Sequence, residues 1–145
     1  MGISIIKSCG FESDIIDRKK PKNIDLHYNK KLFSSAPESV KRYARTLIDQ
    51  GWVFYTVSQD RGYCSFHSKT ITIPVWAFST LKRPEGFLTW YICHEMAHAY
   101  DECKHAHGAE FMQWLIKICP PAYLFHELEY KPKNAKASGI YLLNL

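Results

Sequence analysis

The chain has 145 residues, which is enough for one domain with a single hydrophobic core and too few for two. Hydrophobic residues make up 46% and charged residues 23%, proportions that exclude a disordered chain, a collagen-like repeat and a charge-rich coiled coil. The net charge of +5 permits contact with nucleic acid without requiring it. We therefore expect a single domain over residues 1–145.

The N-terminus and the cysteines predict a soluble cytoplasmic protein, and we take a bacterial or phage-infected cell as its setting. The apolar run at residues 3–6 is much shorter than the core of a signal peptide. No window approaches the roughly 18 apolar residues that cross a bilayer, so we expect no membrane association. The five cysteines are odd in number and no two are separated by two residues, which argues against a disulfide framework or a zinc ribbon.

The first predicted helix begins near residues 35–38 and ends at Gly51. Ser35 is a plausible N-cap, and Pro37 suits the first turn of a helix. Apolar residues then recur at helical spacing up to the glycine, which is the residue type that most often ends a helix.

Three β-strands are predicted after this helix. Residues 52–57 are rich in β-branched and aromatic side chains, residues 63–67 alternate large with small or polar ones, and residues 70–73 alternate threonine with isoleucine. Turn-forming residues separate the three runs. We expect neighbouring strands in the sequence to pair, which gives an antiparallel three-stranded meander.

Two helices are predicted further along the chain. The first extends from Pro84 to about Tyr100, and its apolar residues cover nearly the whole circumference, so that it must be buried. The second begins near Gly108, with apolar residues at spacings of three, four and seven, and it ends before Pro120. Beyond it we assign only residues 139–143, as a candidate docking strand.

The motif His94-Glu95-Met96-Ala97-His98 lies within the buried helix. Histidines four positions apart face the same side of a helix, so both imidazoles can bind one metal ion. Glu95 lies beside them and can take a proton from a metal-bound water. A helix with two surface histidines and an unrelated glutamate is the simpler interpretation, but the apolar flanking residues disfavour it.

A catalytic zinc site also needs a third protein ligand and an open fourth position. We favour His107, which can reach the metal only if the chain reverses after Tyr100, and the polar residues 101–106 fit such a reversal. His105 is a competitor at nearly the spacing of the metzincins, although residues 101 and 104 depart from their motif. The third alternative is an acidic ligand from downstream: Glu110, Glu127 or Glu129.

The helix motif and the later His107-Gly108-Ala109-Glu110-Phe111 together resemble the SprT-like zinc metallopeptidases, the family of Spartan and bacterial SprT. Residues 62–73 also resemble the β-hairpin that precedes the active-site helix of that family, so that the resemblance covers roughly residues 36–125. It implies an α+β fold, a minimal zincin-like domain whose small antiparallel three-stranded sheet packs on the active-site helix and flanking helices.

The resemblance also implies the roles of individual residues. His94, His98 and His107 match the ligands of a Zn²⁺ ion, Glu95 matches the general base, and Phe111 matches a packing aromatic. The implied activity is that of a metalloendopeptidase acting on a protein or peptide. Many relatives carry a C-terminal zinc ribbon, for which this chain has no cysteine pair. The resemblance therefore leaves open whether this chain acts on DNA-associated proteins.

Two basic, proline-containing segments, residues 17–22 and 130–136, are predicted to be solvated loops that flank the core. They are candidates for nonspecific contact with DNA phosphates. Sequence does not define the oligomeric state.

The rival hypothesis is a zinc-stabilised module that binds protein or DNA without cleaving it. That module would have a closed site of four ligands, with His105 or Cys103 as candidates for the fourth, and would not depend on Glu95. For a peptidase, Tyr63, Tyr100 and His105 are candidates to stabilise the oxyanion, although each is more simply a core aromatic or a surface histidine. Free cysteines such as Cys93 and Cys103 are expected to be small buried hydrophobes.

Overall fold

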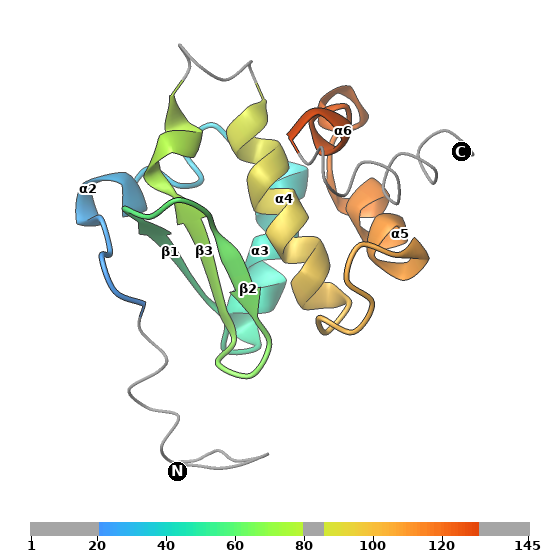
Figure 1. Cartoon of the computed structure of the whole chain (residues 1–145), viewed down its shortest axis with the longest axis horizontal. Helices are drawn as coiled ribbons and strands as arrows, with labels where there is room; N and C mark the ends of the chain where they lie inside the picture. The colour runs from blue at the N-terminus through green and yellow to red at the C-terminus, as the bar shows by residue number, and fades with distance from the viewer. Residues whose placement is uncertain (1–20, 80–85, 131–145) are drawn as a thin grey trace.

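A computed structural model describes residues 21–79 and 86–130 of the chain, and its side chains as far as Leu128. Helices and a small three-stranded sheet are combined in one α+β arrangement (Figure 1). The elements, in chain order, are α2 (Leu26–Asn29), α3 (Glu38–Asp49), β1 (Val53–Val57), β2 (Tyr63–Ser65), β3 (Thr70–Pro74), the 3₁₀-helix η1 (Val75–Phe78), α4 (Phe87–Tyr100), α5 (Ala109–Ile118), the 3₁₀-helix η2 (Pro121–Tyr123) and α6 (His126–Tyr130).

Helix α3 forms where the apolar periodicity predicts it. It buries one stripe of side chains, Val40, Ala44 and Leu47, and its end is followed by Gly51 in the left-handed conformation, with φ of +97°. The helix begins at Glu38, at the end of the predicted range, and Pro37 occupies the N-cap position predicted for Ser35. The short helix α2 precedes it and was not predicted from sequence.

The strand pairing corrects the predicted antiparallel meander. The order in the sheet is β1-β3-β2, with β1 parallel to β3 and only β2 antiparallel to it. All five residues of β3 are buried, whereas β2 has three residues and exposes Tyr63. The uniformly buried strand takes the centre of the sheet because it can be covered on both sides, and the short, partly exposed strand takes an edge.

Gly62 fixes the approach of β2 to its neighbours. Its amide nitrogen donates a hydrogen bond to the hydroxyl of Tyr91 on α4, at 2.8 Å. A Cβ atom at this position would lie 2.1 Å from the carbonyl oxygen of Thr72 in β3. Only glycine therefore allows the chain to enter β2 so close to both the central strand and α4.

Helix α4 lies at the centre of the fold, between the sheet and α5 (Figure 1). It contacts the sheet, α3, α5 and α6, which explains why its apolar residues cover nearly all of its circumference. The predicted burial of this helix is confirmed. It begins at Phe87 after Gly86, so the predicted start at Pro84 lies outside the described residues.

Other predictions concern segments that the structure does not describe. The candidate strand at 139–143 lies outside the described residues, as do most of the two basic segments. Across residues 21–79 and 86–130, the structure contains no helix with the length and apolar character needed to cross a membrane.

Candidate metal centre

The chain reverses direction immediately after α4, as a third ligand from residue 107 requires. The amide of Cys103 bonds the carbonyl of His98 at 2.8 Å, and the amide of Glu102 bonds that of Ala99 at 3.0 Å. This pair of bonds is the Schellman motif that ends many helices. Glu102 and Cys103 both adopt positive φ, +57° and +55°, in place of the usual glycine.

Asp101 holds the reversed segment in place. One carboxylate oxygen accepts the backbone N–H of His105 at 2.9 Å, and the other lies 2.7 Å from Nδ1 of the same histidine. Asp101 is buried although the segment that it organises is exposed. The amide of Gly108 then bonds the carbonyl of His105 at 2.8 Å, and α5 begins at the next residue.

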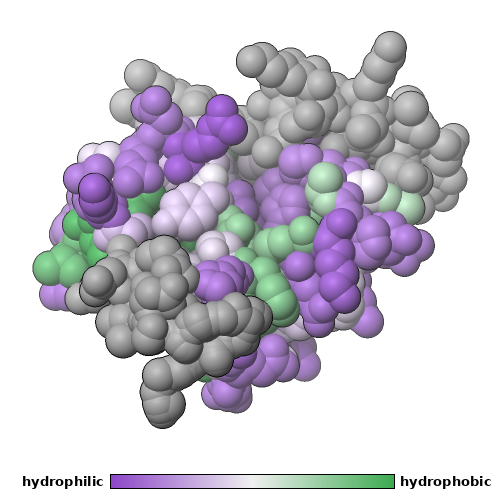
Figure 2. Space-filling view, turned by 60° about the horizontal axis from the view of Figure 1, so that its bottom comes forward, coloured by the Kyte–Doolittle hydropathy of each residue, from purple (hydrophilic) through white to green (hydrophobic). Residues whose placement is uncertain are grey.

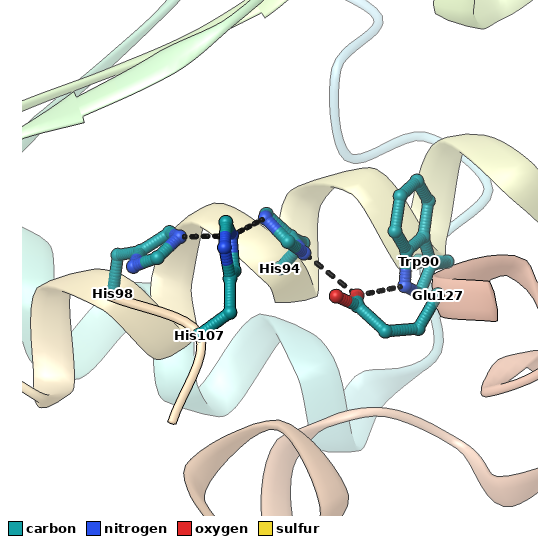
Figure 3. A network of polar contacts seen from close by, with 5 residues as sticks. All are labelled: Trp90, His94, His98, His107 and Glu127. Carbon is teal, nitrogen blue, oxygen red and sulfur yellow. Dashed lines mark hydrogen bonds and ion pairs between the residues drawn. The ribbon is translucent and has the colours of Figure 1, made fainter. Parts of the chain in front are cut away.

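This reversal brings three imidazoles together: those of His94, His98 and His107 (Figure 3). Nε2 of His107 lies 3.2 Å from Nε2 of His94 and 3.2 Å from Nε2 of His98, and the ligand atoms all lie within 4.8 Å of one another. Nitrogen ligands bound at 2.0–2.1 Å in a tetrahedral site are separated by about 3.3 Å. Two of the three separations already match that value, and the cluster can hold a metal ion.

Glu127 contacts the outer ring nitrogen of His94. Its Oε1 lies 2.8 Å from Nδ1 of His94 and accepts the indole N–H of Trp90 at 3.1 Å (Figure 3). An ionised carboxylate can only accept, so this contact favours the tautomer of His94 with its proton on Nδ1, in which the lone pair of Nε2 points into the cluster. His94 is 1% exposed and Glu127 is fully buried, so water does not compete for this contact.

Phe111 forms the floor beneath the three imidazoles. Its ring stacks on His98 with centroids 4.3 Å apart, and it meets the rings of His94 and His107 at 5.0 Å each. The side chain is completely buried at the first turn of α5. This contact shows the packing function expected of Phe111.

Glu95 directly follows His94 on α4, the helix that contacts β2. The pKa of the Cys64 thiol on β2 is raised, chiefly by its hydrogen bond with Cys103, then by burial and by the negative charges of Cys103 and Glu95. Glu95 itself is buried, with 5% of its surface exposed. A buried carboxyl group therefore directly follows the first histidine of the cluster in the chain, and its charge contributes to the raised pKa of Cys64 on β2.

The competing ligands whose side chains the structure describes are not in the cluster. His105 bonds Asp101, and that bond raises the pKa of the imidazole. Glu110 is exposed on α5, Glu127 contacts the outer nitrogen of His94, and the side chain of Glu129 lies outside the described ones. Within the described part of the chain, three residues form the cluster and no fourth His, Cys, Asp or Glu joins them.

Two of the candidate oxyanion donors are engaged elsewhere. The Tyr100 hydroxyl donates to the carbonyl of Tyr43 at 2.7 Å, and His105 is held by Asp101. Tyr63 is partly exposed on β2. Sequence reasoning missed the outer contact of Glu127 and the anchoring role of Asp101. Neither role can be recognised from neighbouring residues in the sequence. His94, a partner of Glu127, lies 33 positions away, and an aspartate at the end of a helix is too common to indicate an anchor.

Among the cysteines, the prediction of small buried hydrophobes is confirmed for Cys93 and wrong for Cys103, which is exposed.

Comparisons with protein-family models, with curated proteins and with solved structures gave no match for this chain.

Proposed function

We propose that the protein is a zinc-dependent metalloendopeptidase of the SprT-like type. The observation that carries the proposal is the convergence of three imidazoles, two from α4 and one from the reversed chain, beside the buried carboxylate of Glu95. This arrangement supplies three nitrogen ligands and a neighbouring base, which are the components that zinc peptidases of this motif use.

The donor set favours Zn²⁺. Imidazole nitrogen is a preferred zinc ligand, and a neutral His94 held by a carboxylate is the form that binds metal. The carboxyl groups of Glu95 and Glu127 are both buried, and a divalent cation bound at the cluster would favour their ionised forms.

When bound, zinc would polarise the scissile carbonyl and lower the pKa of a water ligand. Glu95 would accept the proton of the attacking water and then return it to the leaving amine. His94 would be held in one orientation by Glu127 throughout the cycle. Burial of Glu95 would strengthen its interaction with the reacting groups, because the local dielectric is low.

An extended peptide is the substrate class that the sheet favours. Within the described residues β2 is an edge strand, and it lies against α4, the helix that carries His94 and Glu95. The outer edge of such a strand can pair with an extended chain through backbone hydrogen bonds. A peptide bound along β2 would pass beside the metal centre.

The rival non-catalytic module is less well supported. A structural zinc site has four tight protein ligands, whereas three residues of the described chain make up this cluster. His105 and Cys103 were the candidates for a fourth ligand. His105 contacts Asp101 instead, and Cys103 contacts Cys64.

The test is cleavage of an unstructured protein such as casein by the zinc-loaded chain, with Glu95→Gln as the inactive variant and Glu110→Gln as the matched surface control. We expect Glu95→Gln to bind zinc and lose cleavage, and Glu110→Gln to retain both. Equal cleavage by wild type and Glu95→Gln, or a wild type that does not bind zinc, would overturn the proposal. Parallel reactions with added duplex DNA test whether cleavage depends on nucleic acid.

A further inference from the structure

Two cysteines that the proposed peptidase does not use face each other next to the metal centre. Sγ of Cys103 lies 3.6 Å from Sγ of Cys64, although the residues are 39 positions apart. Cys64 belongs to β2, and Cys103 follows α4 in the turn that leads to His107. Both thiols are free, and Cys103 is exposed to solvent.

We propose that Cys64 and Cys103 are a site of reversible oxidation by hydrogen peroxide, and that the resulting disulfide bond fastens the turn that carries His107 to β2. The two sulfur atoms are already in contact, and a covalent bond requires them to close to about 2.05 Å. Residues 102–106 are all exposed, so the turn can make this adjustment without disturbing the core.

The oxidation has two balanced steps. The sulfur of Cys103, as thiolate, attacks one oxygen of hydrogen peroxide, the O–O bond breaks, and the departing hydroxide takes a proton to leave as water. Cys103 is then a sulfenic acid. The sulfur of Cys64 attacks it, the S–S bond forms, the S–O bond breaks, and the oxygen leaves as a second water with the proton from Cys64. Two thiols are oxidised and one peroxide is reduced to two waters.

The remaining described cysteines provide a contrast within the same molecule. Cys93 and Cys119 are almost fully buried, between α4 and the end of α5, and peroxide cannot reach them without opening of the core. Cys103 is exposed to solvent. The face in Figure 2 combines hydrophilic side chains with smaller hydrophobic patches. Peroxide should therefore oxidise Cys64 and Cys103 and leave Cys93 and Cys119 reduced.

The bond would act on the metal centre through the turn. Cys103 donates its backbone N–H to the carbonyl of His98, and His107 follows four residues later. Release of a metal ion requires His107 to move away from the two histidines of α4. A covalent link from this turn to β2 would restrain that movement. This effect rests on the proposed metal site, whereas formation of the bond does not.

The experiment uses the full chain with Cys9→Ser, because Cys9 lies outside the described residues. Zinc-loaded and zinc-free protein are treated with hydrogen peroxide, and thiols are counted after denaturation. Unreduced tryptic peptides are sequenced by tandem mass spectrometry, because trypsin leaves Cys93 and Cys103 in one peptide, residues 83–104. We expect loss of two of the four remaining thiols, a linked peptide pair containing Cys64 and Cys103, and full reversal by dithiothreitol. The Cys64→Ser variant should accumulate sulfenic acid on Cys103, and Cys119→Ser should behave like its parent.

Zinc release to a chelator is then compared in the oxidised and reduced forms. We expect release to be several-fold slower after oxidation, and unchanged by peroxide in Cys103→Ser. Absence of the 64–103 link, or a link between other cysteines, would overturn the modification site. A link without slower release would overturn its fastening action. Failure to bind zinc at all would refute the metal centre and leave the thiol result standing, so the two failures are distinguishable.

Discussion

Oε1 of Glu127 lies 2.8 Å from Nδ1 of His94, and the same oxygen accepts the indole N–H of Trp90. This contact connects α6 to the middle of α4 and places an acceptor on the outer nitrogen of a histidine whose other nitrogen faces the cluster. Metal-binding histidines commonly have such a partner, which sets their tautomer and raises their basicity.

We expect Glu127→Gln to lower zinc affinity by about 10- to 100-fold. The amide keeps the shape of the side chain but loses its charge, so it supports the metal-binding tautomer of His94 less strongly. Competition with a chelating dye measures the affinity. The exposed Glu110→Gln is the matched control, and an affinity for Glu127→Gln equal to that of the control would contradict the role of this contact.

Zinc should stabilise the folded chain through His107. A ligand present at 100 times its dissociation constant adds about 2.7 kcal/mol to the free energy of unfolding when it binds only the folded state. We expect calorimetry to show this increase for wild type and for His27→Ala, whose histidine is exposed on α2. The increase should be largely lost in His107→Ala. Wild-type behaviour of that variant would remove residue 107 from the site.

Asp101→Asn should loosen the turn that presents His107. An amide offers one acceptor oxygen where the carboxylate uses two, for the backbone N–H and the ring of His105. We expect faster hydrogen exchange at the amides of residues 103–107 and weaker zinc binding, with little change in the rest of the chain. Glu102→Gln is the control, because it removes a charge from the same turn and leaves the two contacts between Asp101 and His105 in place. Unchanged exchange in Asp101→Asn would show that the turn holds without its anchor.

Phe111→Ala should destabilise the zinc-free protein by about 3–5 kcal/mol, the usual range for loss of a buried aromatic ring. Urea unfolding measures this change, and zinc affinity should fall as well because all three imidazoles rest on the ring. Phe125→Ala, at a side chain that is 43% exposed, should have a much smaller effect. Equal losses in the two variants would argue against the packing role.

Gly62→Ala should lower the free energy of unfolding by about 1–3 kcal/mol, because the added Cβ must displace the backbone of β3 at Thr72. The neighbouring Asp60→Ala substitution, at an exposed turn residue, is expected to be nearly neutral. Thermal unfolding of the two variants side by side gives the comparison. A neutral Gly62→Ala would mean that β2 can shift outward freely.

Much of the fold follows from periodicity, because α3, α4 and α5 each carry a distinct apolar pattern. The spacing of His94 and His98, and the need for a reversal before His107, also led to the three residues that the structure brings together. Strand order could not be predicted in this way. Alternation of side chains is the same in parallel and antiparallel strands, and the decisive feature, complete burial of β3, is a tertiary property.

The contact of Glu127 could not be predicted either. It depends on where α6 docks after Pro120 and Pro121, and a five-residue helix has too few residues to show a reliable period. Sequence reasoning considered this residue as an inner ligand, whereas the structure places it against the outer nitrogen of His94.

The three histidines that could hold an ion, and the residues that support them, all come from residues 90–127, while the edge strand β2 comes from an earlier, separate stretch of chain. In the proposed peptidase, changes in the loops on either side of β2 would therefore remodel the surface offered to a peptide without moving an imidazole. Such a division would let selectivity evolve, or be engineered, independently of the chemistry.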